Sequence, residues 1–588
     1  MRRHALLALV AIFSFGFISA ANAQTSYSWN TSGSGSWLTS SNWTGGASYP
    51  GSTSGTYDSA TFGIDPVGGY TVSIASGSTV YINTISFTQT DTTAANSYTI
   101  TGGTINLGGT SPNAIPTFNV ATAGVSATIA SALTGSSGLN ITGSGTLILT
   151  SASNSFTGGV GVSGGALQIS SAANLPSANA LTLSGGALYM TGSMTLGNNV
   201  TIASGQSGTL KMVGAKTGTL SGNYAGVAGT LTLDESGGTG YTGFTITSTS
   251  GPSTGAIVNI LGATGTGNVQ VGDNASLATQ AFFANAVVNV TATGSGVTYL
   301  AYGNNVGSPT AQFGALNGGN ASTLIAFDNR TGIVTINGVA NGNFAGTIGN
   351  GAGGVGPAQL IKNGAGTQIL SGANTYTGAT TINGGVLQVA SAEKPGTSGP
   401  LGNLAATAAG TIVFGGGTLQ YSTANQFDYS GRFSTAASQL YSIDTNGQQV
   451  TFATGLASSG GSLTLMDSAG GGKLTLTGAS TYSGNTTITS GTLQIGGAGS
   501  LGSANYSGNI ANNGTLQYSS TATQAFSGSI SGSGSLIKDT STSVLVLSGS
   551  NSYTGTTTVN AGILSVTGTL AGGVSLGATP PSLETATT

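Results

Sequence analysis

The sequence predicts an all-β protein, a right-handed parallel β-helix with a Trp-rich cap at its amino-terminal end. Three observations lead to this prediction. One pattern of three short strands and two turns is written four times along the chain. The chain contains 102 Gly among 588 residues and only 4% charged residues, yet 38% of its residues are hydrophobic. No part of the repeated unit has the pattern of a helix.

The clearest copy of the repeat spans residues 364–389. Its strand signals are apolar residues at every second position, as in Leu474 and Leu476 of another copy, which places them on one face of a strand. Gly, Asn and Thr fill the two turns, at 372–378 and 383–385, because Gly and Asn tolerate positive φ and hydroxyls can bond the turning backbone. The unit therefore carries its own turns.

Each copy also contains an aromatic residue followed eleven positions later by Leu. These pairs are Phe156 and Leu167, Tyr376 and Leu387, Tyr482 and Leu493, and Tyr553 and Leu564. Strands this short bury an apolar face only if each coil stacks on the next, so we expect the Leu side chains to point inward and the aromatic residues to occupy equivalent corners. A set of β-sandwich domains is the competing architecture, since short strands with frequent turns suit both.

The repeated string, Gly-x-Leu-x-Leu followed by Ser/Thr-Gly, an aromatic residue, Thr-Thr and Gly-x-Leu-Gln, resembles the autotransporter-associated β-strand repeat, also called the passenger-associated transport repeat. The triplets Leu-Ile-Lys at 360–362 and 536–538 resemble the Leu-x-Lys that often precedes it. The resemblance implies a secreted β-helical passenger, displayed at the cell surface or outer membrane of a bacterium. It does not imply a catalytic activity.

Residues 1–23 have the pattern of a secretory signal peptide, with a basic start, an apolar run and an Ala-Asn-Ala end before Gln24. The run is short for a membrane anchor, and we expect no membrane span in the mature chain. Cleavage by the export machinery removes His4, the single His, and the chain has no Cys. Catalysis by Ser-His-Asp or Cys-His, His/Cys zinc sites and disulfides are therefore excluded from the mature protein.

The mature chain is nearly uncharged. Removal of Arg2 and Arg3 leaves 8 of the 10 Lys and Arg residues against 13 Asp and Glu residues. These charges are few and scattered, which predicts no nucleic-acid partner and no binding to anionic membranes. Ser, Thr, Asn and Gly remain for contact with a possible glycan or host-surface ligand.

Residues 24–64 form a distinct Trp-rich region that contains Trp29, Trp37 and Trp43. A stacked β-helix exposes raw strand edges at its ends, so a cap is the first interpretation. The second interpretation is a sugar-binding surface, in which exposed Trp faces stack on sugar rings. Beyond the cap we expect one solenoid domain over 65–570 and an unstructured tail over 571–588.

The sequence after Val566 shows neither an apolar anchor nor a run of ten-residue amphipathic strands of the kind that builds an outer-membrane barrel. We expect either release of the passenger by another route or a sequence that continues beyond Thr588.

Charged residues offer few candidates for catalysis. The adjacent pair Asp234 and Glu235 is either a partial calcium site or an exposed turn. Three other pairs predict only surface ion pairs: Asp328 with Arg330, Asp428 with Arg432, and Lys538 with Asp539. We expect no catalytic residues, no metal and no cofactor, and a non-catalytic structural or adhesive role. The alternative is a polysaccharide lyase or hydrolase that uses carboxylates such as Asp273 within 205–355.

Overall fold

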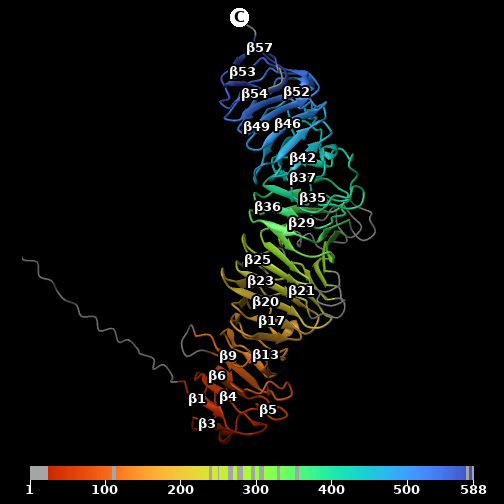
Figure 1. The fold of residues 1–588 in the computed structure, drawn as a ribbon. Helices are drawn as coiled ribbons and strands as arrows, with labels where there is room; N and C mark the ends of the chain where they lie inside the picture. The colour runs from red at the N-terminus through yellow and green to blue at the C-terminus, as the bar shows by residue number, and fades with distance from the viewer. Residues whose placement is uncertain are drawn as a thin grey trace, which may run out of the picture. The chain divides into compact units, whose positions relative to one another are not determined.

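The structure, a computed structural model, describes residues 24–108, 114–236, 242–248, 250–262, 269–273, 282–292, 298–302, 310–327, 331–350, 357–577 and 582–585. The expected signal peptide at 1–23 lies outside them. The chain is nearly all β, a parallel β-solenoid of about 20 turns, as the repeats predicted. It divides into two compact units, Met1–Val160 and Gly161–Thr588. In each unit, successive strands stack as coils (Figure 1).

The first unit has three runs of paired strands, and each pairing is parallel except that of β3 with β1. One run is β3 (Trp43–Thr44), β1 (Ser26–Trp29), β4 (Asp58–Phe62), β6 (Thr79–Phe87), β9 (Thr117–Val120) and β12 (Leu139–Gly143). The second is β2 (Gly35–Ser36), β5 (Tyr70–Ser73), β7 (Tyr98–Thr101), β10 (Ser126–Ile129) and β13 (Thr146–Leu149). The third joins β6 to β8 (Thr104–Leu107) and β11 (Ala132–Thr134).

The longest run of the second unit contains sixteen parallel strands. They are β15 (Ala166–Ile169), β17 (Ala187–Met190), β20 (Ser207–Met212), β23 (Thr230–Asp234), β25 (Ile257–Leu261), β27 (Val287–Thr291), β30 (Ala315–Gly318), β33 (Gly342–Phe344), β36 (Thr367–Leu370), β38 (Val386–Val389), β40 (Thr418–Gln420), β41 (Leu440–Asp444), β43 (Ser462–Met466), β45 (Thr486–Ile488), β48 (Ile510–Asn512) and β51 (Ile530–Ser531).

Further parallel runs form the other faces of this unit. One run is β16 (Leu181–Leu183), β19 (Val200–Ile202) and β22 (Gly226–Val227). A second run is β18 (Met194–Leu196), β21 (Thr217–Leu220), β24 (Thr242–Ile246), β26 (Val269–Asp273), β28 (Thr298–Tyr302), β31 (Thr323–Phe327) and β34 (Thr347–Ile348). A third run is β29 (Thr310–Phe313), β32 (Ile333–Ile336), β35 (Gln359–Lys362), β37 (Thr380–Ile382) and β39 (Ile412–Phe414). Toward the carboxyl end they are β42 (Gln449–Phe452), β44 (Lys473–Leu476), β46 (Thr492–Gly497), β49 (Thr515–Ser520), β52 (Ser535–Leu547) and β54 (Thr557–Val566), with β47 (Asn505–Tyr506), β50 (Gln524–Phe526), β53 (Ser550–Asn551), β55 (Thr569–Leu570), β56 (Val574–Leu576) and β57 (Ser582–Thr585). β14 (Val160–Val162) lies at the boundary between the units.

Helical structure among the described residues is limited to short 3₁₀ turns, such as η1 (Ser40–Asn42), η2 (Ala172–Asn174), η4 (Ser430–Arg432) and η5 (Gly502–Ala504). In the described residues no helix is both long and apolar enough to cross a membrane.

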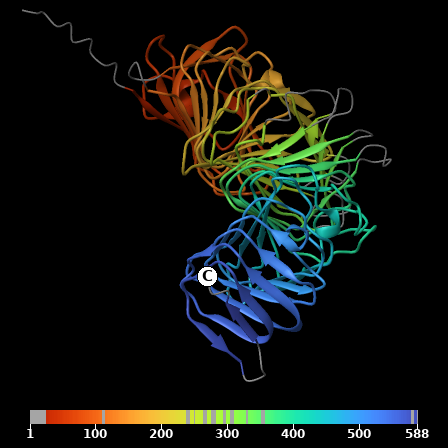
Figure 2. The same ribbon diagram turned by 90° about the horizontal axis from the view of Figure 1, so that it is seen from above.

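The core consists of columns of identical or similar side chains at one register position in successive coils. Leu474 of β44 pairs with Leu493 of β46, which pairs with Leu516 of β49 and then Leu536 of β52. All four Leu side chains are fully buried. On β44, β46 and β49 the residues on either side of the Leu face outward. Figure 2 shows such carboxyl-terminal strands, in blue, lying side by side. The period-two pattern thus places one apolar face inside each coil.

The four repeat copies place their aromatic residues at an equivalent buried corner, and in three of them this residue is a Tyr that contacts a Thr. Hydroxyl oxygens of Tyr376 and Thr380 lie 2.6 Å apart, and the same pairing recurs at 2.6 Å between Tyr482 and Thr486 and at 2.5 Å between Tyr553 and Thr557. In the fourth copy Phe156 has no hydroxyl, and four residues later Val160 stands where the others have Thr. Both Phe156 and Val160 are buried. The hydroxyl pair is therefore replaced as a pair by two apolar groups, which avoids an unsatisfied buried donor.

Buried Gln side chains bond to backbone N–H and C=O groups where a short strand leaves the β-ladder incomplete. Gln368 of β36 accepts a bond from the Leu316 amide (3.1 Å) and donates to the Leu316 carbonyl (2.8 Å), two coils away. The coil between them contributes Gly342, whose missing side chain leaves the space that the amide crosses. Gln524 makes the same pair of bonds to the backbone of Leu501. These side chains replace missing ladder bonds and keep the buried backbone satisfied.

Two segments differ in organisation from the main coils. Residues 571–588, where the sequence suggests no strand pattern, contain β56 and β57, which both pair with β54. At the other end, the Trp-rich region places β3 antiparallel on β1, on the side opposite β4. The side of β1 that faces away from the coils is thus occupied by a reversed strand.

We expect Leu493→Ala to lower the free energy of unfolding by about 2 to 5 kcal/mol, because the side chain is fully buried between Leu474 and Leu516 and its loss leaves a cavity. Urea unfolding followed by far-UV circular dichroism measures the loss. The exposed Thr451→Ala of β42 is the control and should change stability by less than about 0.5 kcal/mol. Equal effects of the two substitutions contradict the inward assignment.

Candidate functional site

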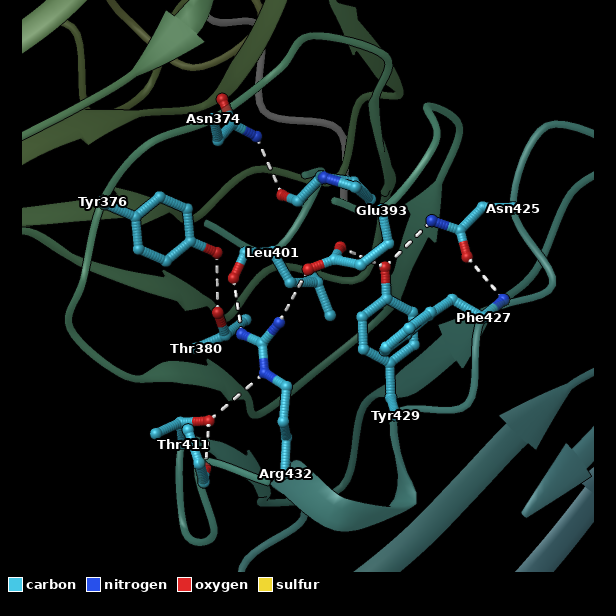
Figure 3. A network of polar contacts seen from close by, with 12 residues as sticks. Asn374, Tyr376, Thr380, Glu393, Leu401, Thr411, Asn425, Phe427, Tyr429 and Arg432 are labelled. Carbon is cyan, nitrogen blue, oxygen red and sulfur yellow. Dashed lines mark hydrogen bonds and ion pairs between the residues drawn. The ribbon is translucent and has the colours of Figure 1, made fainter. Parts of the chain in front are cut away.

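A cluster of buried charged and polar side chains surrounds Glu393 and Arg432 (Figure 3). The Arg432 Nη1 lies 3.2 Å from the Glu393 Oε1, and the two side chains are 0% and 1% exposed. Arg432 Nη2 donates to the Leu401 carbonyl at 2.6 Å, and its Nε donates to the Thr411 hydroxyl at 3.4 Å. One guanidinium therefore holds three points of the long segment between β38 and β39.

Tyr429 and Asn425 complete this cluster from the segment between β40 and β41. The Tyr429 hydroxyl donates to the second Glu393 oxygen at 2.7 Å, and the Asn425 amide donates to that hydroxyl at 2.9 Å and to the Ser391 carbonyl at 2.7 Å. Burial raises the pKa of Glu393, while the bond from Tyr429 and the charge of Arg432 oppose that rise. Burial likewise holds the pKa of Tyr429 well above its usual range.

These groups are chemically suited to catalysis but lack access to a substrate. Glu393, Tyr429 and Arg432 are each completely or almost completely covered, and their polar atoms are already paired with one another. Tyr376 and Thr380 of the repeat lie beside them in Figure 3 and are buried as well. The cluster works as an internal clamp that fastens two long surface segments to the solenoid.

The two Leu-x-Lys lysines occupy equivalent buried positions. Lys362 donates from its Nζ to the Gly364 carbonyl and, at 3.1 Å, to the Gly384 carbonyl of the next coil. Lys538 donates to the Thr540 carbonyl and, at 3.3 Å, to the Ala561 carbonyl. Each amine thus joins the turns of two successive coils. Burial lowers the pKa of Lys362 to about 8 and also lowers the pKa of Lys538.

We expect the unfolding free energy of the protein, relative to Lys362→Gln, to increase by about 2 kcal/mol between pH 8 and pH 9.5. The folded pKa is about 8 and the unfolded value 10.5, so in this window the unfolded chain holds a proton that the folded chain has lost. Stability therefore rises with pH, while the neutral amine still donates to both carbonyls. Urea unfolding at each pH measures the difference.

The control for this titration is Thr451→Ala, because Thr451 is exposed on β42 and has no titrating group. Its stability difference from the wild type should not change over the same pH range. A flat difference for Lys362→Gln as well contradicts the buried-amine assignment.

The side chains of the adjacent acids Asp234 and Glu235 have different hydrogen-bond partners. Asp234 accepts a bond of 2.7 Å from Lys211 on the neighbouring strand β20 and two bonds from Ser236. Glu235 is 1% exposed and accepts the amide of Phe244 at 2.8 Å. Burial raises the pKa of Glu235 well above its ordinary value. The two carboxylates thus serve different partners.

The other candidates for acid or base chemistry are not brought together by the described structure. Asp273 lies at the end of β26, while Asp328 and Arg330 lie outside the described residues. No group of three or more Asp, Glu or His residues is positioned to hold a metal ion in the described part of the chain. A surface groove at the turns that precede β25, β27, β30 and β33 is lined by groups such as Val287, Asn337 and Val339, and its lining contains no ionisable side chain.

Trp29, Trp37 and Trp43 form one buried aromatic cluster, with exposures of 3%, 0% and 4%. Ring centroids of Trp29 and Trp43 are 5.1 Å apart, those of Trp37 and Trp43 are 4.9 Å apart, and all three contact Phe62 of β4. Trp43 Nε1 donates to the Trp37 carbonyl at 2.8 Å, and Trp37 Nε1 donates to the Pro50 carbonyl at 2.9 Å. None of these indoles presents an open ring face for a sugar, and the role as an end cap stays a prediction.

The surface ion pairs expected from sequence are wrong where the structure describes them. Arg432 does not pair with Asp428 but with Glu393, 39 residues away, and Asp428 accepts the amides of Ser430 and Ala453. Lys538 turns inward to carbonyls instead of pairing with Asp539. Lys538 and Asp539 are consecutive residues of β52 and therefore point to opposite sides of the strand. Arg432 finds its partner Glu393 in the preceding coil.

Glu393, Tyr429 and the tyrosines outside the repeat carry no sequence signal of burial, because a lone polar residue among Gly, Ser and Asn is typical of an exposed turn. Lys362 and Lys538 could be found only through the Leu-x-Lys triplet, which marks their position but not their bonds.

The fold and its clusters define a repeat-built β-solenoid whose buried polar groups serve the stacking of its coils. The passenger-associated-transport-repeat family model matches the chain at residues 140–169, 360–389, 469–495 and 540–566. The chain thus carries passenger-associated transport repeats at four places, the same four that the sequence pattern picks out. Searches of curated proteins and of solved structures found no match to the chain.

These repeats and the solenoid fit an autotransporter passenger domain. The repeat family is associated with autotransporter proteins, which are exported to the cell surface.

Proposed function

We propose that the mature protein is an exported, non-catalytic β-solenoid that acts as a structural and adhesive protein at the bacterial surface or in the surrounding medium. The observation that carries this proposal is the position of the transport repeats within the coils, where their recurring Leu, Tyr and Lys side chains are buried and build the fold. The repeat residues therefore serve a displayed scaffold, and the outer faces of the coils remain for contact.

The distribution of charge supports a scaffold over an enzyme. Of the described Lys and Arg residues, Lys362, Lys538 and Arg432 are buried in backbone or ion-pair contacts, and Lys211 is paired with Asp234. The buried carboxylates of Glu235 and Glu393 are directed to interior partners. Polysaccharide cleavage by two carboxylates requires an accessible pair on one face.

Export is tested by expressing the full chain in a Gram-negative host and comparing it with an Ala21→Asp, Ala23→Asp variant in which signal cleavage is blocked. We expect the wild type to start at Gln24 and to be digested by protease added to intact cells or recovered from the medium. The variant should keep its signal segment and remain inaccessible. Wild-type protein that stays uncleaved inside the cell contradicts the proposal.

The non-catalytic part is tested on purified protein with neutral and acidic polysaccharides, with and without Ca²⁺. We expect no release of reducing ends or unsaturated products. Turnover that disappears in Asp328→Ala or Arg330→Ala overturns the scaffold proposal and favours the polysaccharide lyase or hydrolase.

A further inference from the structure

Two half-buried tyrosines, Tyr57 and Tyr81, meet on the outer surface of the first unit. The ring centroids of Tyr57 and Tyr81 are 6.0 Å apart at an interplanar angle of 74°, which is an edge-to-face contact. Tyr81 faces outward on β6 because its neighbours Val80 and Ile82 are fully buried. An outward aromatic pair of this kind offers a ring surface that the buried Trp residues do not.

Polar groups continue the surface from the aromatic pair along the register of the sheet. Tyr81 pairs with Asn106 of β8, and Asn106 pairs with Thr134 of β11. The Tyr57 hydroxyl donates to the Asn106 Oδ1 at 3.4 Å, and the Asn106 Nδ2 donates to the Thr134 hydroxyl at 3.3 Å. A phenol, an amide and a hydroxyl thus lie in one row beside the two rings, and each keeps further hydrogen-bonding capacity.

The loop that carries Tyr57 is fixed by hydrogen bonds to the buried side chains of Trp37 and Asp58. Trp37 donates to the Pro50 carbonyl, and the Gly51 amide donates to the buried Asp58 carboxylate at 2.9 Å. The Gly51 carbonyl in turn accepts the amide of Tyr81 at 3.2 Å. Gly51 has a φ of 72°, and a Cβ there would meet the backbone of Tyr81. The buried cluster therefore fixes the loop against β6, which positions the two rings before any ligand arrives.

The charge of the first unit decides which ligand suits this row. Residues 24–160 contain no Lys, Arg or His, and their three acids are Asp58, Asp65 and Asp91. Asp58 is buried, and the carboxylates of Asp65 and Asp91 accept backbone amides of the 90–93 loop. A surface without cationic side chains offers no charged partner to a phosphate, sulfate or uronate. A ligand with both hydroxyl groups and apolar C–H faces, but without charge, is the chemical complement.

We propose that Tyr57, Tyr81, Asn106 and Thr134 form a binding site for a neutral polysaccharide. Sugar rings stack on the tyrosine pair, and their hydroxyls bond to the amide and the threonine. This inference rests on the proposed adhesive function and gives it a ligand class and a place on the molecule.

The test uses the purified mature chain, with insoluble cellulose, chitin and β-1,3-glucan in pull-down assays and soluble mannan, xylan, alginate and polygalacturonate in affinity gels. We expect retention by at least one neutral polymer and none by the two acidic polymers. Tyr57→Ala and Tyr81→Ala should each weaken retention at least tenfold, since stacking on one ring contributes a large part of such binding. Tyr81→Phe, which keeps the ring, should retain most of it.

Two further variants separate this site from a general effect on folding. Tyr189→Ala, at a half-buried outward tyrosine on β17 of the second unit, should leave retention unchanged. Gly51→Ala should weaken retention although both tyrosines remain, because the loop must shift away from Tyr81. Trp fluorescence checks each variant of the first unit, as all three Trp residues lie within it.

Failure to bind any neutral polymer, preference for the acidic polymers, or full retention by the two Tyr→Ala variants overturns the site. Export and protease accessibility are measured separately on the same proteins. If display succeeds and retention fails, the site is wrong and the exported scaffold stands; if display fails, the proposed function falls regardless of retention.

Discussion

Between pH 10 and pH 12 we expect the protein to unfold cooperatively, with loss of its β-sheet circular dichroism and simultaneous ionisation of tyrosine. The cause is the number of tyrosines in the core. Ten tyrosine side chains are fully buried in the described residues: Tyr98, Tyr224, Tyr376, Tyr421, Tyr429, Tyr441, Tyr482, Tyr506, Tyr518 and Tyr553. Burial is the main cause that raises the pKa of every one of them above 10.

The sign of the effect follows from proton binding. Above pH 10 the unfolded chain releases its tyrosine protons and the folded chain keeps them. The unfolding free energy therefore keeps its full value below pH 10 and falls as the pH rises above 10. At pH 11 a tyrosine that keeps its proton in the folded chain lowers the unfolding free energy by about 1.4 kcal/mol. Burial raises the pKa strongly for Tyr224, Tyr376, Tyr421, Tyr429 and Tyr482, and these five together lower the unfolding free energy by about 7 kcal/mol. That is comparable to the whole stability of a typical domain, about 5 to 15 kcal/mol. The gain from the lysines, at two positions, is much smaller.

Absorbance at 295 nm and far-UV circular dichroism, recorded on one sample as pH rises, measure this transition. The buried tyrosines should ionise in one step that coincides with the loss of structure. Tyr482→Phe serves as a matched variant that removes one titrating group. Gradual ionisation of all tyrosines near pH 10 with the sheet signal intact contradicts the prediction.

The solenoid could be predicted from sequence because its information is local and repeated. Leu493 is recognisable as a core residue from its own strand, since the alternation with Thr492 and Gln494 fixes which face it takes. The same position in other copies repeats the evidence. The repeated unit carries its own turns, which favoured stacked coils over the competing β-sandwich domains without any knowledge of distant contacts.

The polar sites could not be predicted because their partners come from other coils. No residue near Arg432 in the sequence indicates that Glu393 is its partner. The pair depends on the path of two long segments, one between β38 and β39 and the other between β40 and β41. The contact of Tyr57 with Tyr81 likewise depends on the loop through Gly51. Sequence reasoning assigned charged neighbours to each other, whereas in a stacked coil the nearest group is usually one coil of chain away.

The second large effect is expected for Arg432→Met, which should destabilise the part of the solenoid around β38 to β41 by about 3 to 5 kcal/mol at pH 7. The substitution leaves the Glu393 carboxylate buried without its cation and the Leu401 carbonyl without its donor. Hydrogen exchange of 391–411 and proteolysis within that segment measure the loss locally. Trp fluorescence, which reports only the first unit, is the internal control and should not change.

Two comparisons show whether the unpaired charge is the cause. Adding Glu393→Gln to Arg432→Met removes that charge and should recover at least half of the lost stability. Lowering the pH to about 4.5 should also reduce the deficit. Burial already raises the pKa of Glu393, so the folded variant keeps a proton that the unfolded chain releases above that pH, and its stability falls as pH rises. A deficit that is independent of pH and unaffected by Glu393→Gln assigns the loss to packing around Leu401 and Thr411 instead of to the ion pair.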